Sequence, residues 1–175
     1  MVLSENEQLD QNKREEPMSF MTKVIITGLV GGILWSSLGY VAYIFNFTEI
    51  SPNFVLQPWA LGAWKNGILG NIISIVVIGI LGIGAAIAYF AALKKFPQFW
   101  IGILYGGALW GLVFIILNPM FPSIETVNKL TLETNVTNLC LYILFGVFVG
   151  YSISFEHNEM QYRKQHGSHQ QTSNK

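Results

Sequence analysis

The chain has 175 residues, of which 51% are hydrophobic and 11% charged, and its acidic and basic residues balance to a net charge of zero. This composition is too apolar for a soluble domain of this size. We therefore expect an integral membrane protein whose surroundings are the lipid bilayer, with no nucleic-acid partner.

Four apolar runs contain no Asp, Glu, Lys, Arg or His in their interiors. They cover residues 24–45, 68–93, 99–117 and 136–155. A transmembrane helix needs about 20 apolar residues, because roughly 30 Å of hydrocarbon is crossed at 1.5 Å per residue. The sequence thus predicts an all-α membrane domain over residues 21–155 with four transmembrane helices.

The positive charges gather on one side of these predicted spans. Eight of the ten precede the first span, lie between the second and third, or follow the fourth: Lys13, Arg14, Lys23, Lys94, Lys95, Arg163, Lys164 and Lys175. The positive-inside rule then places both termini and the 94–98 turn in the cytoplasm. We interpret residues 1–20 as a disordered cytoplasmic tail and residues 156–175 as a second cytoplasmic tail.

The two connections on the other side are rich in aromatic and polar residues. Pro58 is suited to open a short helix that runs toward the second span, and Ser123 is suited to cap another. An irregular surface loop is the alternative in both places.

The first and third spans share the phrase GG-x-LW. It occurs as Gly31, Gly32 and Trp35, and again 75 residues later as Gly106, Gly107 and Trp110. This spacing predicts two similar tandem hairpins, although chance is a real alternative because the letters are common in a glycine-rich membrane protein. We expect the two tryptophans to lie over these glycines and face the bundle interior.

Small residues at four-residue spacing favour close helix packing, within one chain or with a partner. The candidate site is therefore a helix-packing face or pocket made of Gly31, Gly32, Trp35, Tyr40, Asn71, Gly106, Gly107 and Trp110. The spans hold no carboxylate for proton coupling and no arginine, and the chain has no catalytic motif that we recognise. We expect no catalytic residue, no cofactor and no metal site.

A resemblance to a known family rests on the order of several phrases along residues 18–155. These are GG-x-LW-S-S-x-GY, then PWALGAWKNG, then KKFPxFWxGxxYGxxLW, then LNPxFP. The pattern resembles the YqhR type of membrane protein from Bacillus-like Firmicutes. The resemblance implies a multi-pass protein of the cell membrane and brings no activity with it.

Two functional hypotheses follow from these observations. The first is a non-enzymatic membrane component that packs with itself or with another membrane protein. The alternative is a small carrier or pore subunit with a site between spans one to three, using Trp35, Trp110 and Asn71. An enzyme acting on lipid is the weakest hypothesis.

Overall fold

The computed structural model describes residues 19–60, 62–93, 99–121 and 124–172. Most of the tail expected over residues 1–20, and the 94–98 turn, lie outside the described residues. The described residues form helices and contain no strand, which confirms the predicted all-α class.

Four α-helices in the described part of the chain carry the apolar runs. They are α2 (Phe20–Ile44), α3 (Ile68–Leu93), α4 (Phe99–Gly111) and α5 (Leu132–Thr172). By length and composition, α2, α3 and the Leu132–Glu156 part of α5 are able to cross a membrane.

The fourth candidate, α4, is continued by a π-helical turn, η3 (Leu112–Ile116). The apolar helix Trp100–Ile116 formed in this way is shorter than the other three. At 1.5 Å per residue it reaches roughly 25 Å, against about 30 Å of hydrocarbon. Three of the four predicted crossings are therefore supported by helix length, and the crossing by α4 stays a prediction.

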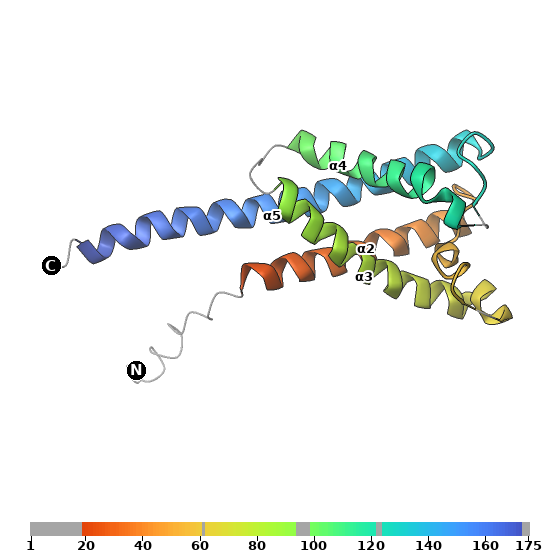
Figure 1. Cartoon of the computed structure of the whole chain (residues 1–175), viewed down its shortest axis with the longest axis horizontal. Helices are drawn as coiled ribbons and strands as arrows, with labels where there is room; N and C mark the ends of the chain where they lie inside the picture. Colours follow the sequence, from red (N-terminus) through yellow and green to blue (C-terminus); the bar gives the residue numbers. More distant parts are fainter. Residues whose placement is uncertain (1–18, 61, 94–98, 122–123, 173–175) are drawn as a thin grey trace, which may run out of the picture.

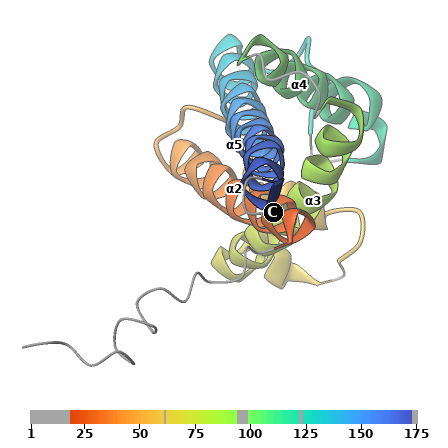
Figure 2. The ribbon, with the colours of Figure 1, turned by 90° about the vertical axis from the view of Figure 1, so that its left-hand side faces the viewer.

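The helices are arranged as two hairpins, α2 with α3 and α4 with α5, and α5 also packs along α2 (Figure 1). The start of α2 and the C-terminal part of α5 lie at one end of the molecule, called here the termini end. The α2–α3 and α4–α5 connections lie at the opposite end, called here the loop end. Viewed along the bundle, α2, α3 and α4 are arranged around α5 (Figure 2).

Glycine brings the two helices of the first hairpin into backbone contact. A Cβ atom added to Gly28 would lie 2.7 Å from the Cα of Ile83, and one added to Gly32 would lie 2.8 Å from the Cα of Gly79. Any larger residue at these positions would push the helices apart. Close packing of this kind supplies the dispersion contacts that hold helices together where lipid removes the hydrophobic effect.

The second hairpin repeats this packing. A Cβ on Gly102 would lie 2.9 Å from the Cα of Val147, and one on Gly106 would lie 2.6 Å from the Cα of Ile143. These close approaches correspond to those of α2 at an offset of 74 residues, whereas the GG-x-LW phrase repeats at 75. The two hairpins are thus similar in packing, one residue out of step with the similarity in sequence.

A dense hydrophobic core fills the half of the bundle nearest the termini end. Its buried members come from α2, α3 and α5: Val24, Ala86, Tyr89, Phe145, Val149 and Ile153. The half nearest the loop end is packed less completely, as described below.

The loop end contains short 3-10 turns: η1 (Pro52–Leu56), η2 (Ala63–Asn66) and η4 (Asn118–Met120). The helix expected to open at Pro58 does not begin there; Pro52 opens η1 instead, in the first-turn position where a proline lacks no needed N–H.

The second connection is irregular over residues 124–130, and Ile124 at its start is only 6% exposed. The cap expected at Ser123 lies outside the described residues.

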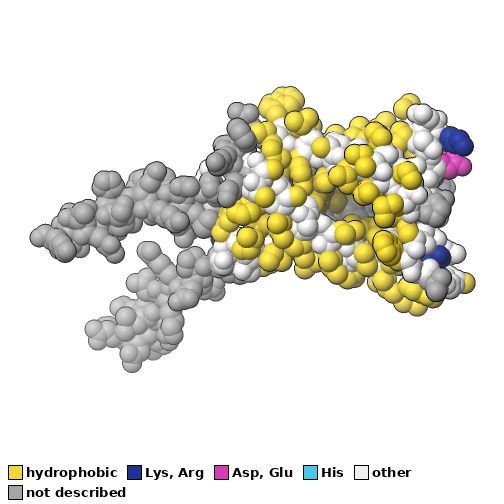
Figure 3. Space-filling view, in the orientation of Figure 1, with side chains coloured by type: hydrophobic (Ala, Val, Ile, Leu, Met, Phe, Trp, Pro, Cys, Tyr) yellow, Lys and Arg dark blue, Asp and Glu magenta, His cyan; other side chains and the backbone are white. Residues whose placement is uncertain are grey.

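Large apolar side chains cover the outside of the helices; Leu104 is 74% exposed and Ile80 58% exposed. On the face seen in Figure 3, such side chains cover the middle of the bundle, and the described charged groups lie at the loop end. Exposing so much apolar surface to water would be unfavourable, whereas contact with the hydrocarbon core of a bilayer would not.

Candidate functional site

A cavity of about 440 Å³ lies between the two hairpins in the half nearest the loop end. α3 lines one wall from Ile78 to Ala88, and α4 with η3 lines the other from Tyr105 to Val113. Among the described residues, α3 and α4 do not pack against each other along their lengths. In contrast, α2 packs against α5. The cavity therefore opens sideways between α3 and α4, with α2 and α5 as its floor, on the side that Figure 3 faces.

The described wall of this cavity is apolar and holds no Asp, Glu, Lys, Arg or His. Its polar side chains are bonded mainly to the protein. Ser36 donates to a backbone carbonyl one turn earlier (2.6 Å), and the Asn138 amide donates to Oγ1 of Thr48 (2.8 Å). The volume falls in the range of about 300–1,000 Å³ that is usual for ligand pockets. The site is thus suited to non-covalent binding of an uncharged, apolar group.

Two contacts join elements of the protein near the two ends of the cavity. At the loop end, the rings of Phe54 and Phe121 meet edge to face with centroids 5.3 Å apart. Toward the termini end, the Tyr105 hydroxyl donates to the backbone oxygen of Ala85 (2.6 Å) and so bridges α4 to α3. The Tyr105 ring also packs edge to face on Tyr89, with centroids 5.1 Å apart, which fixes its position.

Asn71, in the first turns of α3, holds the loop end together. Its Oδ1 accepts hydrogen bonds from the Ser51 hydroxyl (2.5 Å) and from the backbone N–H of Asn53 (3.2 Å). Its amide donates to the backbone oxygen of Gly67 (3.3 Å). The side chain is only 5% exposed. Asn71 therefore fixes η1 over the end of α3, where Pro52 and neighbouring residues close the cavity.

Of the eight residues proposed from the sequence, Gly32 and Trp35 line the cavity. Asn71 is engaged with η1, and Tyr40 stacks on Tyr43 with centroids 6.5 Å apart. Trp110 stacks on Phe114, centroids 5.7 Å apart, and is absent from the described cavity wall. The structure does not bring Trp35, Trp110 and Asn71 into one cavity.

The four glycines of the GG-x-LW phrases have different surroundings. Gly31 faces the ring of Phe148 (3.0 Å from an added Cβ), and Gly32 and Gly106 face the backbones of α3 and α5. An added Cβ on Gly107 meets no atom within 4 Å. Gly31, Gly32 and Gly106 therefore make room for neighbouring helices, whereas Gly107 does not.

A buried indole N–H usually has a hydrogen-bond acceptor. Nε1 of Trp35 and Nε1 of Trp110 are buried, and neither has an acceptor among the described residues.

Sequence reasoning missed Tyr105 and Asn138, which bridge elements near the two ends of the cavity. The signal for Tyr105 is a hydroxyl in the middle of an apolar span, which requires an acceptor on a neighbouring helix. Asn138 gives a similar signal, since an amide near the start of a span must be satisfied within the protein. The direction in which either side chain points depends on helix packing that one sequence does not specify.

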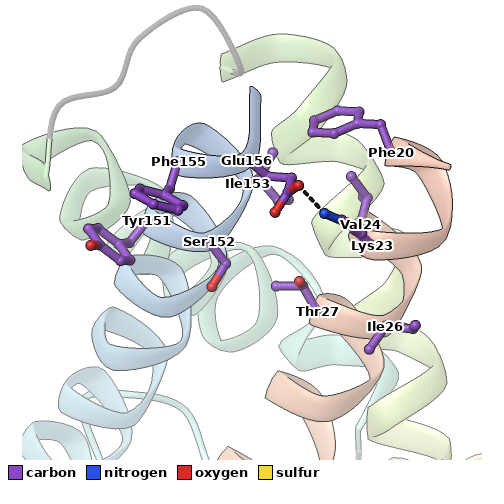
Figure 4. A pocket seen from close by; sticks show the side chains of 10 residues that line it. All are labelled: Phe20, Lys23, Val24, Ile26, Thr27, Tyr151, Ser152, Ile153, Phe155 and Glu156. Carbon is purple, nitrogen blue, oxygen red and sulfur yellow. Dashed lines mark hydrogen bonds and ion pairs between the residues drawn. The ribbon is translucent and has the colours of Figure 1, made fainter. Parts of the chain in front are cut away.

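A second recess, of about 350 Å³, lies at the termini end between α2 and α5. Figure 4 shows Lys23 and Glu156 forming an ion pair across it, with Thr27 and Ser152 farther along the two helices. The paired side chains are 33% and 22% exposed, so solvent screening limits such a pair to about 1 kcal/mol at most. The pair joins the beginning of α2 to α5 across 133 residues of sequence and so has a positioning role.

The family described as "Conserved membrane protein YqhR" matches residues 4–168 of the chain. The chain is also 52% identical over 160 residues to a protein of Bacillus subtilis (strain 168) named "Uncharacterized protein YqhR", covering 91% of this chain and 89% of that protein. No solved structure matches the chain.

Proposed function

Because the chain belongs to the YqhR family of conserved membrane proteins, we propose that it is a non-enzymatic component of the cell membrane that binds a guest between its two hairpins. The observation that carries this proposal is the apolar cavity that opens between α3 and α4. The polar groups nearby support it, because Asn71, Asn138 and Tyr105 each join two parts of the protein by hydrogen bonds. Their roles are structural, and none is paired as nucleophile and base.

The proposed topology has four spans with both termini in the cytoplasm. Glycine-tight packing of α4 along α5 supports the fourth crossing, because a helix in backbone contact with a spanning helix shares its surroundings. The excess of lysine and arginine on the termini side supports the orientation. Reporter fusions test it: a fusion near Glu125 should read out as external, and a cytoplasmic signal there would mean that the orientation is reversed.

The carrier or pore hypothesis receives less support. A transport path requires polar groups that lead from one side of the membrane to the other, whereas this cavity wall is apolar, with Phe54 and Phe121 at one end and the buried core around Tyr89 at the other. These features fit a molecule that stays bound in the cavity better than one that is transported through it.

Association with a second copy or with another membrane protein is a secondary proposal. Many of the small residues at four-residue spacing, such as Gly28 and Gly32, are already in contact with another helix of the same chain. Cross-linking in membranes through Cys140, which is exposed, tests self-association. A species that stays monomeric at all cross-linker concentrations would contradict the homo-oligomer.

Native mass spectrometry of the full chain in gentle detergent tests the binding proposal. Gly84 lines the cavity, and a Cβ added there meets no atom within 4 Å, so Gly84→Leu should place a bulky side chain in the cavity without a backbone clash. Gly107→Leu is the matched control, because Gly107 is equally unobstructed but lies off the cavity wall. We expect a non-covalent adduct on the wild type and on Gly107→Leu that is lost from Gly84→Leu. Equal adducts on all three proteins, or none on any, would refute the proposal.

A further inference from the structure

We propose that the guest is a hydrocarbon tail of a bilayer lipid, taken from the leaflet at the loop end. This inference rests on the proposed function, and it adds the chemical class of the ligand and the side from which it enters.

The polarity of the wall favours a hydrocarbon tail. The described lining carries no charged residue, and the donors of Ser36, Asn138 and Tyr105 are directed to protein acceptors. Nε1 of Trp35 has no acceptor among the described residues, but this atom is itself buried. A ligand with buried polar groups would lose its hydrogen bonds to water and gain few in return, at a substantial free-energy cost. A saturated chain loses nothing of this kind.

The length of the cavity fits one leaflet. The α3 wall runs from Ile78 to Ala88, which at 1.5 Å per residue is about 15 Å. This is about half of the roughly 30 Å of hydrocarbon in a bilayer. A lipid tail occupies this depth, whereas a second transmembrane helix would extend over the whole thickness. Because Phe54 and Phe121 close one end and the buried core around Tyr89 lies at the other, the cavity does not continue as a groove for such a helix.

The position of the cavity selects the leaflet. On α2 its lining residues, Gly32 to Gly39, lie in the half nearer Ile44, and on α5 they begin at Asn138, shortly after the helix starts. Both places belong to the loop end. On α3 the lining runs across the middle of the helix, from Ile78 to Ala88, so α2 and α5 are the helices that assign the leaflet. In the termini half the hydrophobic core lies between the helices, and the recess there, between α2 and α5, is crossed by the Lys23–Glu156 ion pair.

Fluorescence quenching by brominated lipids tests the inference, because Trp35 lines the cavity. A protein that keeps Trp35 alone, with the other tryptophans replaced by phenylalanine (Trp59, Trp64, Trp100 and Trp110), is reconstituted in phosphatidylcholine vesicles with and without brominated tails. Trp35 lies nine residues before Ile44, about 13 Å from that helix end, so bromines deep in the tail should quench it most. We expect the quenching to fall at least twofold in Gly84→Leu and to stay unchanged in Gly107→Leu.

Three outcomes separate this inference from the proposed function. Equal quenching in the two leucine variants, or strongest quenching by bromines near the carboxyl end of the tail, would overturn the lipid-tail assignment. If Gly84→Leu removes the adduct seen by mass spectrometry while bromolipids do not quench, the cavity binds a guest that is not a lipid tail. If Gly84→Leu is destabilised, Ala88→Leu on the same wall repeats the test; loss of quenching there supports the inference, and unchanged quenching refutes it.

Discussion

The neighbouring glycines of α4 offer a direct test of the packing described above. Gly106→Ala places a methyl group 2.6 Å from the Cα of Ile143, whereas Gly107→Ala places one where no atom lies within 4 Å. The two variants share the helix, the membrane depth within one residue and the chemical change. A difference in stability between the two variants therefore reports the contact of α4 with α5. Helix propensity cannot cause it, because both variants replace glycine by alanine in the same helix.

The expected magnitude follows from two opposing terms. Replacing glycine by alanine within a helix stabilises it by about 1 kcal/mol at either position. At Gly106 the crowded backbone adds an overpacking cost of about 1–3 kcal/mol, because no side-chain rotation relieves it. Gly107→Ala should then be more stable than wild type, and Gly106→Ala less stable than Gly107→Ala by about 1–3 kcal/mol, or roughly 5- to 150-fold in the unfolding equilibrium constant.

Reversible unfolding in mixed micelles, with an increasing fraction of denaturing detergent and tryptophan fluorescence as the signal, measures this difference. Wild-type protein and both variants should be compared at the same protein-to-detergent ratio. Identical unfolding midpoints for the two alanine variants would refute the reasoning, and so would a Gly106→Ala protein more stable than Gly107→Ala.

Three further predictions concern the polar contacts. Asn71→Ala should destabilise the protein by about 1–3 kcal/mol and speed hydrogen exchange in residues 51–57, because it leaves buried partners unpaired; Asn66→Ala, at an exposed position, should change both far less. A double-mutant cycle on Lys23 and Glu156, read as thermal stability in detergent, should give a coupling of at most about 1 kcal/mol that weakens with salt; coupling insensitive to salt would contradict an ion pair at the membrane surface. Tyr105→Phe should cost about 0.6 kcal/mol, the usual value for one interhelical hydrogen bond within a membrane, measured by the same micelle unfolding; an unchanged midpoint would mean that the bridge to α3 is not formed.

Hydropathy predicts the buried lengths of the helices well and their polar ends poorly. The second predicted span, 68–93, coincides with α3, because its apolar run is bounded by a glycine and a lysine pair. In contrast, α5 begins at Leu132, four residues before the predicted start at 136. Thr131 and Thr134 form a hydrogen-bonded first turn there, and such polar residues contribute nothing to a hydropathy signal.

The candidate site was only partly accessible from the sequence. Trp35 and Gly32 stand out as an unusual pair in the middle of a span, and both line the cavity. Gly84 carries no sequence signal, since its neighbour Gly82 has the same letter and makes a tight helix contact that Gly84 lacks. The difference between them is the direction in which each faces around α3, and this depends on how the hairpins sit against each other.

Because of the one-residue mismatch between the sequence repeat and the packing repeat, the two hairpins present different side chains to the cavity. In an α-helix one residue corresponds to a rotation of about 100°. When the close contacts of the hairpins are matched, Trp35 is paired with Leu109, which also lines the cavity, while Trp110 is carried around to a different side of its helix. A molecule bound there would contact a broad, rigid indole from α2 and a smaller branched side chain from α4.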